Sequence, residues 1–213
     1  MTSFAVLASG TGSNFEAIAD AVQSGRLAAK LVGVVSDVPD AGVLAKARLR
    51  GITTAVVPRE KDRAAHDRKI LQALDALPGG RPRFLVLAGY MRVMTSTLIQ
   101  AFRADRYSRI VNIHPSLLPA FPGVAGYAQA YAHGAKIAGV TVHLVDEGLD
   151  SGPICAQGAF SISECESVHE VEDLGKELEH RLYPETLSWI LPEKFKLEER
   201  ETASVRRLCV RPI

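Results

Sequence analysis

Short, nearly continuous apolar runs alternate with longer segments of mixed polarity along the first half of the chain. Five runs rich in β-branched residues are typical of strands buried on both faces, and they lie at 4–9, 30–37, 53–58, 83–89 and 109–114. Between them, apolar positions at helical spacing predict helices over 14–24, 41–50 and 62–77. This alternation predicts an α/β protein with a parallel sheet and right-handed crossovers.

The pattern changes after residue 137. Two further apolar runs, at 139–146 and 153–162, are joined by a glycine-bearing stretch, which predicts an antiparallel addition to the sheet. A long helical pattern over 167–191 follows, and Pro192 ends it. We expect residues 1–191 to form one domain and the charged residues 192–213 to form a peripheral strand or tail.

Length and composition fit one ordinary globular domain. The 213 residues carry 25 Lys and Arg against 24 Asp and Glu, and the net charge of +1 provides no field that would attract nucleic acid or an anionic membrane. The three cysteines lack zinc-site spacing, which predicts reduced thiols, no metal and a cytoplasmic location. No signal or transit peptide is expected, and the longest apolar run, 84–94, is far shorter than the ~20 residues that span a bilayer. Binding of small molecules at a local site is therefore expected.

The first candidate site is a glycine-rich loop, SGTGSN at 9–14, directly after the first predicted strand. The amides of Gly12, Ser13 and Asn14 would lie at the positive end of a helix dipole, where a phosphate binds well. The loop is not a dinucleotide fingerprint, because Phe15 stands at the third glycine position, and it is not a Walker loop. The alternative is a simple helix cap by Ser13.

Asp37 ends the second predicted strand and stands before Val-Pro-Asp. In a nicotinamide site an acid at this place would bind the ribose. We interpret Asp37 instead as a residue that begins a turn.

Two polar side chains share one face of the strand predicted over 109–114. Asn112 and His114 are two residues apart, so both project away from the face of their apolar neighbours. Pro115 ends the strand, which puts the imidazole at the carboxyl end, where open parallel sheets bind ligands. Buried polar groups need hydrogen-bond partners or a role toward a ligand. The two residues are therefore either hydrogen-bonded members of the core or part of a catalytic site.

An acidic, glycine-rich segment over 146–153 is expected to be a loop that brings a carboxylate to a ligand. If Asp150 meets His114, its charge favours the imidazolium form, although Asp150 could equally be only a turn residue. An amide donor, an imidazole and a carboxylate, without an activated Ser or Cys, suit acyl transfer through a tetrahedral intermediate.

Five motifs occur in a fixed order: ASGTGSN near the start, LAGYMRVM at 87–94, NIHPSLLPAFPG at 112–123, TVHLVDEGLDSGP at 141–153 and LEHRLYP at 178–184. Together they resemble the formyltransferase family from Phe4 to about Trp189, and the GTGSN loop narrows the resemblance to members that formylate glycinamide ribonucleotide. The resemblance implies a Rossmann-like, three-layer α/β/α formyltransferase fold with a mostly parallel sheet. It also implies one catalytic domain, with a phosphate-binding half at about 1–100 and a folate-binding, catalytic half at about 101–191.

The resemblance further implies transfer of a formyl group from 10-formyltetrahydrofolate to the amine of N1-(5-phospho-D-ribosyl)glycinamide in purine (IMP) biosynthesis. It assigns the phosphate to Gly12, Ser13 and Asn14. It makes His114 the general acid, Asn112 the oxyanion donor and Asp150 the support of His114. It assigns folate binding to Arg63, Met91, Arg92, Val93, Met94, Asn112, Asp146 and Asp150, with Arg63 on the glutamate tail, and ribonucleotide contacts to Lys176 and Glu179. From the residues alone, Lys176 and Glu179 would be a surface pair one turn apart.

The chain departs from the family pattern after its FPG tripeptide, where Val124-Ala125-Gly126-Tyr127 stands in place of a His-containing stretch. With a tyrosine at this place, the segment resembles that of formyltetrahydrofolate deformylase. That enzyme hydrolyses the same donor with a similar Asn, His and Asp set but lacks the GTGSN loop. Two alternatives therefore stay open, a deformylase and a non-catalytic folate- or nucleotide-binding sensor. We expect a monomer or a homodimer.

Overall fold

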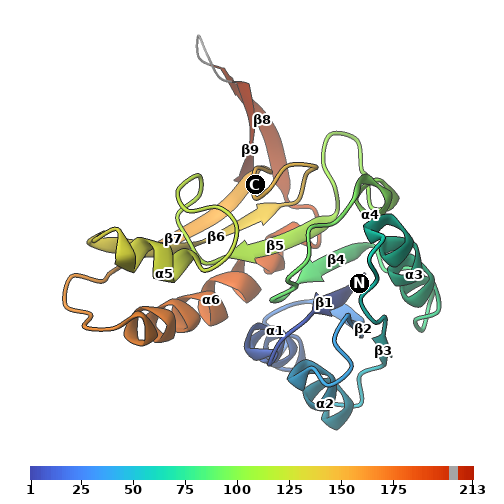
Figure 1. Ribbon diagram of the computed structural model, residues 1–213. Helices are drawn as coiled ribbons and strands as arrows, with labels where there is room; N and C mark the ends of the chain where they lie inside the picture. Colours follow the sequence, from blue (N-terminus) through green and yellow to red (C-terminus); the bar gives the residue numbers. More distant parts are fainter. Residues whose placement is uncertain (202–205) are drawn as a thin grey trace.

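The computed structural model describes residues 1–201 and 206–213, and its centre is a seven-stranded sheet between two layers of helices (Figure 1). The strands of this sheet are β1 (Thr2–Ala8), β2 (Ala29–Ser36), β3 (Thr54–Val56), β4 (Phe84–Leu87), β5 (Ile110–His114), β6 (Ile137–Leu144) and β7 (Ile154–Ser161). The helices are α1 (Ser13–Gln23), α2 (Gly42–Leu49), α3 (Arg63–Asp75), α4 (Ser96–Ala101), α5 (Gly126–Ala132) and α6 (Val168–Ile190).

The sheet has the order β3-β2-β1-β4-β5-β6-β7. Neighbouring strands from β3 to β5 are parallel, whereas β6 runs antiparallel to both β5 and β7. The predicted mostly parallel sheet with an antiparallel addition is therefore confirmed. The chain moves outward from β1 to β3 and then returns to the other side of β1, so a ligand crevice is expected where β1 and β4 end.

Alternate residues of the central strands feed two separate apolar cores. On one face Phe4 and Val6 pack with α1, α2, α5 and α6, and on the other Ala5 and Leu7 pack with α3 and α4. The three-layer arrangement follows from this division (Figure 1). The sequence pattern does not predict α4 or α5, because each is shorter than two helical turns and gives no clear period.

The face that carries α3 and α4 is polar farther along the sheet, on β5 and β6. Thr141 Oγ1 donates a 2.7 Å hydrogen bond to the Ser116 carbonyl and accepts one of 3.0 Å from the Leu118 amide. The segment after β5 is thereby fixed over β6. This region, covered by loops, is where the candidate site forms.

The residues expected to be a peripheral strand or tail form a two-stranded antiparallel hairpin of β8 (Phe195–Glu201) and β9 (Arg206–Pro212). Glu193, which has φ of 57°, fastens it to the sheet. The Glu193 carboxylate accepts hydrogen bonds from Tyr107 Oη at 2.5 Å and from Arg109 Nε at 2.8 Å, and it also pairs with Arg83. Because Arg83 and Arg109 directly precede β4 and β5, these contacts tie the hairpin to the amino ends of both strands.

Glu193 is expected to stabilise the fold in a pH-dependent way. Burial alone would raise the pKa of its carboxyl, but the hydrogen bonds from Tyr107, Arg83 and Arg109 outweigh burial and lower the pKa from 4.5 to about 2. The unfolded chain therefore binds this proton more tightly than the folded chain. The stabilisation is complete well above pH 4.5, is lost as the pH falls through 4.5 toward 2, and corresponds to about 3 kcal/mol.

We therefore expect Glu193→Gln to lower the free energy of unfolding by about 2–3 kcal/mol at pH 7, and by progressively less from pH 5 to pH 3. Urea unfolding across this range measures the effect. Glu198→Gln is a matched control on the same hairpin, because Glu198 makes a 3.3 Å contact with the exposed Arg211. An effect of Glu193→Gln that stays constant with pH would contradict the assignment.

Candidate active site

β5 carries two polar side chains to the carboxyl end of the sheet. Asn112 and His114 project from one face of the strand, whereas Val111 and Ile113 belong to the apolar core on the other. This is the arrangement that their two-residue spacing predicts. His114 is only 3% exposed, and Pro115 follows it directly.

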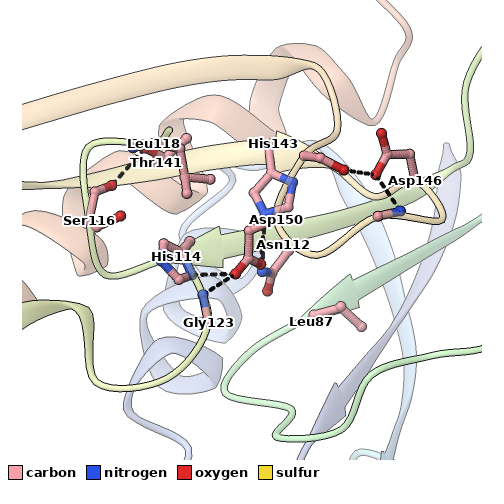
Figure 2. Close-up of polar contacts among 12 residues, drawn as sticks. Leu87, Asn112, His114, Ser116, Leu118, Gly123, Thr141, His143, Asp146 and Asp150 are labelled. Carbon is pink, nitrogen blue, oxygen red and sulfur yellow. Dashed lines mark hydrogen bonds and ion pairs between the residues drawn. The ribbon is translucent and has the colours of Figure 1, made fainter. Parts of the chain in front are cut away.

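Asp150 meets His114 from the loop between β6 and β7 (Figure 2). Asp150 Oδ2 lies 3.4 Å from His114 Nδ1 and accepts a 2.7 Å hydrogen bond from the Gly123 amide. The expected approach of this carboxylate to the imidazole is therefore observed. Asp150 also has a left-handed backbone, with φ of 49°, so it is a turn residue as well as the partner of His114.

Both ring nitrogens of His114 face hydrogen-bond acceptors. Nδ1 faces the Asp150 carboxylate, and Nε2 lies 2.9 Å from the Phe121 carbonyl oxygen. Because a carbonyl oxygen accepts but does not donate, Nε2 is the donor toward Phe121, and Nδ1 is the nitrogen that faces Asp150. The ring is thereby held in one orientation, with its Nδ1 edge beside Asp150 and Asn112 (Figure 2).

His143 belongs to this cluster and was missed by the sequence analysis. It lies directly opposite Asn112 in the antiparallel pairing of β5 and β6, with its Nε2 3.2 Å from Asn112 Nδ2. Burial lowers the pKa of His143 despite the opposing effects of the Leu144 carbonyl and Asp150, so the ring is neutral at neutral pH. Nδ1 donates to the Leu144 carbonyl, which leaves Nε2 to accept from the Asn112 amide and to fix its orientation.

These side chains open into a cavity of about 260 Å³. Its walls come from residues 89–94, 123–125 and 145–150, together with the ends of β4, β5 and β6. Met91 and Val93 on one wall and Val124 and Leu149 on another are more than half exposed, so apolar side chains rim the opening. The cavity therefore joins a polar floor to an apolar mouth.

The structure places most of the expected folate residues on this cavity, but not all of them. Met91, Arg92, Val93 and Met94 line it, as does Asp146. The Asp146 carboxylate holds its own loop by accepting from the Ser151 hydroxyl at 2.7 Å and from the Gly148 amide at 3.1 Å. Arg63 instead begins α3 in an exposed position and does not line the cavity, so its contact with a glutamate tail stays a prediction.

The cavity wall that contains Met91 is tied to the glycine-rich loop through Ser9. Ser9 Oγ accepts a 3.1 Å hydrogen bond from the Met91 amide and donates one of 2.6 Å to Asp37 Oδ1. The Asp37 side chain is fully buried and also accepts from Arg59 Nε at 2.6 Å. The interpretation of Asp37 as merely a turn residue is therefore wrong, because its carboxylate orients Ser9 between the two loops.

The glycine-rich loop has a conformation suited to binding an anion. Gly12 has φ of 83°, which favours glycine, and a Cβ there would lie 2.8 Å from Val43 Cβ. No side chain caps α1, so the alternative of a helix cap by Ser13 is wrong. The first helical bond runs from the Glu16 amide to the Gly12 carbonyl, which leaves the amides of Ser13 and Asn14 without a partner inside the helix.

Glu179 is buried beside this loop rather than paired on the surface. It is 8% exposed and accepts a 2.6 Å hydrogen bond from Asn14 Nδ2 and another of 2.6 Å from the Tyr127 hydroxyl. Lys176 is partly exposed and contacts Asp173 at 3.2 Å instead. The expected surface pair of Lys176 and Glu179 is therefore wrong, and a ribonucleotide contact by Lys176 stays a prediction.

A second cavity, of about 410 Å³, shares residues 145–148 with the first and reaches Arg207 on the terminal hairpin. The cluster of Asn112, His114 and Asp150 lines the smaller cavity and not this one. Within residues 1–201 and 206–213, no group of three or more His, Cys, Asp or Glu side chains could hold a metal ion. No helix in the same part of the chain has the length and hydropathy to cross a membrane.

Known proteins resemble this chain over most of its length. The Formyl transferase family matches residues 2–187. A phosphoribosylglycinamide formyltransferase of Bacillus subtilis (strain 168) is 42% identical over 193 residues, which cover 90% of this chain and 95% of that protein. The crystal structure of glycinamide ribonucleotide transformylase 1 from Symbiobacterium toebii has a TM-score of 0.89 at 37% identity, and the match covers 100% of this chain and 94% of that one. The trifunctional purine biosynthetic protein adenosine-3 of Drosophila melanogaster is 36% identical over 189 residues, 88% of this chain and 14% of that protein.

Proposed function

Because this chain belongs to the formyl transferase family, we propose that it transfers a formyl group from 10-formyltetrahydrofolate to the amine of N1-(5-phospho-D-ribosyl)glycinamide, in purine (IMP) biosynthesis. The convergence of Asn112, His114 and Asp150 on one cavity carries the proposal. These groups supply a hydrogen-bond donor, an imidazole and a carboxylate, which acyl transfer to an amine needs. They do so without a nucleophilic Ser or Cys, so the formyl group passes directly between the substrates.

The cavity supports the assignment of the folate donor. A flat ring system with a polar edge fits a site whose floor is polar and whose mouth is rimmed by apolar side chains such as Met91 and Leu149. The 145–150 segment lines the cavity and offers backbone groups to the polar edge of the ring. We assign the donor to this segment and to Met91, Arg92, Val93 and Met94 opposite.

The glycine-rich loop supports the assignment of the acceptor. It follows β1, and β1 and β5 are separated only by β4, so the strand that leads into the loop lies roughly 10 Å across the sheet from the strand that carries His114. That span suits a phosphorylated ribose with a short amide arm. We assign the phosphate to Gly12, Ser13 and Asn14, and the ribose to Glu179 beside them.

The side chains then have defined parts in the reaction. The acceptor amine attacks the formyl carbon, and the Asn112 amide donates to the carbonyl oxygen as negative charge develops there. As the bond from the formyl carbon to the folate nitrogen breaks, the amine loses a proton and the folate nitrogen gains one. His114 donates that proton to the folate nitrogen, and the proton that the amine loses returns the ring to its charged form, which Asp150 stabilises. The products are tetrahydrofolate and the formylated ribonucleotide.

An ultraviolet assay of tetrahydrofolate release, with and without glycinamide ribonucleotide, tests this function. Release that depends on the ribonucleotide is expected. Release at the same rate without it would indicate a deformylase, and no release in either case would indicate a binding protein. Either of the last two results would contradict the proposal.

We expect this activity to survive exhaustive chelation, because His114 is committed to proton transfer and Asp150 to His114. The assay is repeated after dialysis against excess EDTA. Loss of activity that is restored by zinc or magnesium would contradict the expectation.

We propose a cytoplasmic enzyme that acts on small molecules, without nucleic acid or membrane partners, as a monomer or a homodimer. The free thiols of Cys155, Cys165 and Cys209 support a reducing compartment. We also propose a single catalytic domain over 1–191, in which the halves 1–100 and 101–191 share both sites, since Asn14 contacts Glu179 and the 89–94 wall faces Asp150.

A further inference from the structure

Tyr127 lies in the segment that departs from the family pattern, and its hydroxyl is buried against Glu179. We infer that Tyr127 is a positioning residue of the acceptor site, which holds the Glu179 carboxylate in the orientation that receives the acceptor's ribose hydroxyls. The inference rests on the proposed function, because it concerns binding of the ribonucleotide.

Each carboxylate oxygen of Glu179 accepts a hydrogen bond from a different residue. The Tyr127 hydroxyl donates to Oε1 at 2.6 Å and Asn14 Nδ2 donates to Oε2 at 2.6 Å. All three residues are less than a tenth exposed. The carboxylate therefore cannot rotate without breaking one of two buried, charge-assisted hydrogen bonds, and its remaining lone pairs keep a fixed direction.

Asn14 leaves a second acceptor at the same place. Its Oδ1 is buried and has no hydrogen-bond partner among the described residues. A buried acceptor without a partner is costly, so a ligand donor is its natural complement. Asn14 Oδ1 and the Glu179 carboxylate together present adjacent acceptors, which match a pair of vicinal hydroxyl groups.

Burial and the nearby Glu179 carboxylate raise the pKa of the Tyr127 phenol well above its ordinary value. The hydroxyl is therefore protonated at neutral pH and is the donor toward Glu179. A histidine at this position would change its charge near neutral pH, whereas the tyrosine does not.

Two glycines allow Tyr127 to lie where it does. A Cβ on Gly175, in the middle of α6, would lie 2.2 Å from Tyr127 Cζ, so only glycine admits the phenol there. A Cβ on Gly126 would lie 2.4 Å from the Pro115 carbonyl oxygen, so glycine also lets α5 begin against the segment after His114. The first turn of α5 thus reaches from the catalytic strand to Glu179.

Tyr127→Phe removes only the hydroxyl and is the direct test. Formyl transfer is measured with glycinamide ribonucleotide varied at saturating 10-formyltetrahydrofolate, and then the reverse. We expect the KM for the ribonucleotide to rise about tenfold, while the KM for the donor and kcat stay within about twofold. Calorimetric titration of the ribonucleotide should show the same weakening without turnover.

Tyr131→Phe is the matched control, because Tyr131 lies on the same helix and its exposed hydroxyl donates to the Glu166 carbonyl. It should leave both KM values unchanged. Gly175→Ala provides a second route to the same signature, because the new Cβ must displace the Tyr127 ring. In the Tyr127→Phe background, Gly175→Ala should raise the KM for the ribonucleotide little further, since the hydrogen bond from position 127 to Glu179 is already gone.

The outcomes separate this inference from the proposed function. If the wild-type protein formylates the ribonucleotide but folded Tyr127→Phe binds it normally, Tyr127 has no positioning role and the inference is wrong. Equal rises in both KM values would also overturn it, because they indicate a general loss of structure. A wild-type protein that neither formylates nor binds the ribonucleotide would overturn both proposals.

Discussion

Replacing His114 by alanine is expected to lower kcat by about 10²–10⁴-fold while the fold survives. The imidazole is the one group in the cluster that can deliver a proton to the leaving folate nitrogen, and Asp150 and the Phe121 carbonyl already hold it in place. Asp150→Asn should also lower kcat, because it removes the charge that stabilises the imidazolium. Steady-state kinetics at saturating concentrations of both substrates measure these losses.

The matched control for His114 is His169→Ala. His169 is a mostly exposed histidine on α6, where it contacts Asp173 at 3.5 Å. It should leave kcat unchanged. A folded His114→Ala protein with near wild-type kcat would show that the proton comes from another group.

Replacing Asn112 by alanine is expected to lower kcat by about 10²–10³-fold, through loss of the donor to the carbonyl oxygen. Asn112→Asp gives a sharper test, because it keeps the side-chain volume but replaces the amide donor with a charged acceptor. It should be at least as slow as the alanine variant. Circular dichroism and thermal unfolding of both variants control for loss of structure.

His143 allows a second test of the role of Asn112, since its Nε2 accepts a hydrogen bond from the Asn112 amide. Once Asn112 is alanine, adding His143→Ala should lower kcat far less than His143→Ala does alone. Independent, multiplicative losses would mean that His143 acts on the substrate and not through Asn112. Near wild-type turnover in Asn112→Asp would return Asn112 to a purely structural role.

Local periodicity is sufficient to predict the architecture and part of the site. Strands and helices alternate in short, regular units, so the parallel sheet follows from residues close together in the sequence. The common face of Asn112 and His114 follows from the two-residue period of a strand. Asp150 could be proposed as their partner because it lies in an acidic loop next to the last strands.

Contacts between distant segments could not be predicted in the same way. His143 joins the site only through the antiparallel register of β5 and β6, and one residue of slippage would turn it to the other face. Asn14 and Glu179, which contact each other, are 165 positions apart in the sequence. Helical spacing alone predicts instead that Glu179 forms an exposed pair with Lys176. Asp37 was misassigned for a related reason, since its partner Arg59 comes from a different loop.

The fit of Tyr127 against Gly175 also constrains how the two positions can change over evolutionary time. Glycine within a helix costs about 0.5–1 kcal/mol relative to alanine, so position 175 has a reason to lose its glycine wherever position 127 is small. Once tyrosine is present at position 127, alanine at position 175 would clash with its ring, so the glycine can no longer be replaced by alanine. A lineage can therefore acquire the tyrosine only after accepting the less favourable glycine, and homologous sequences should contain glycine without tyrosine far more often than tyrosine without glycine.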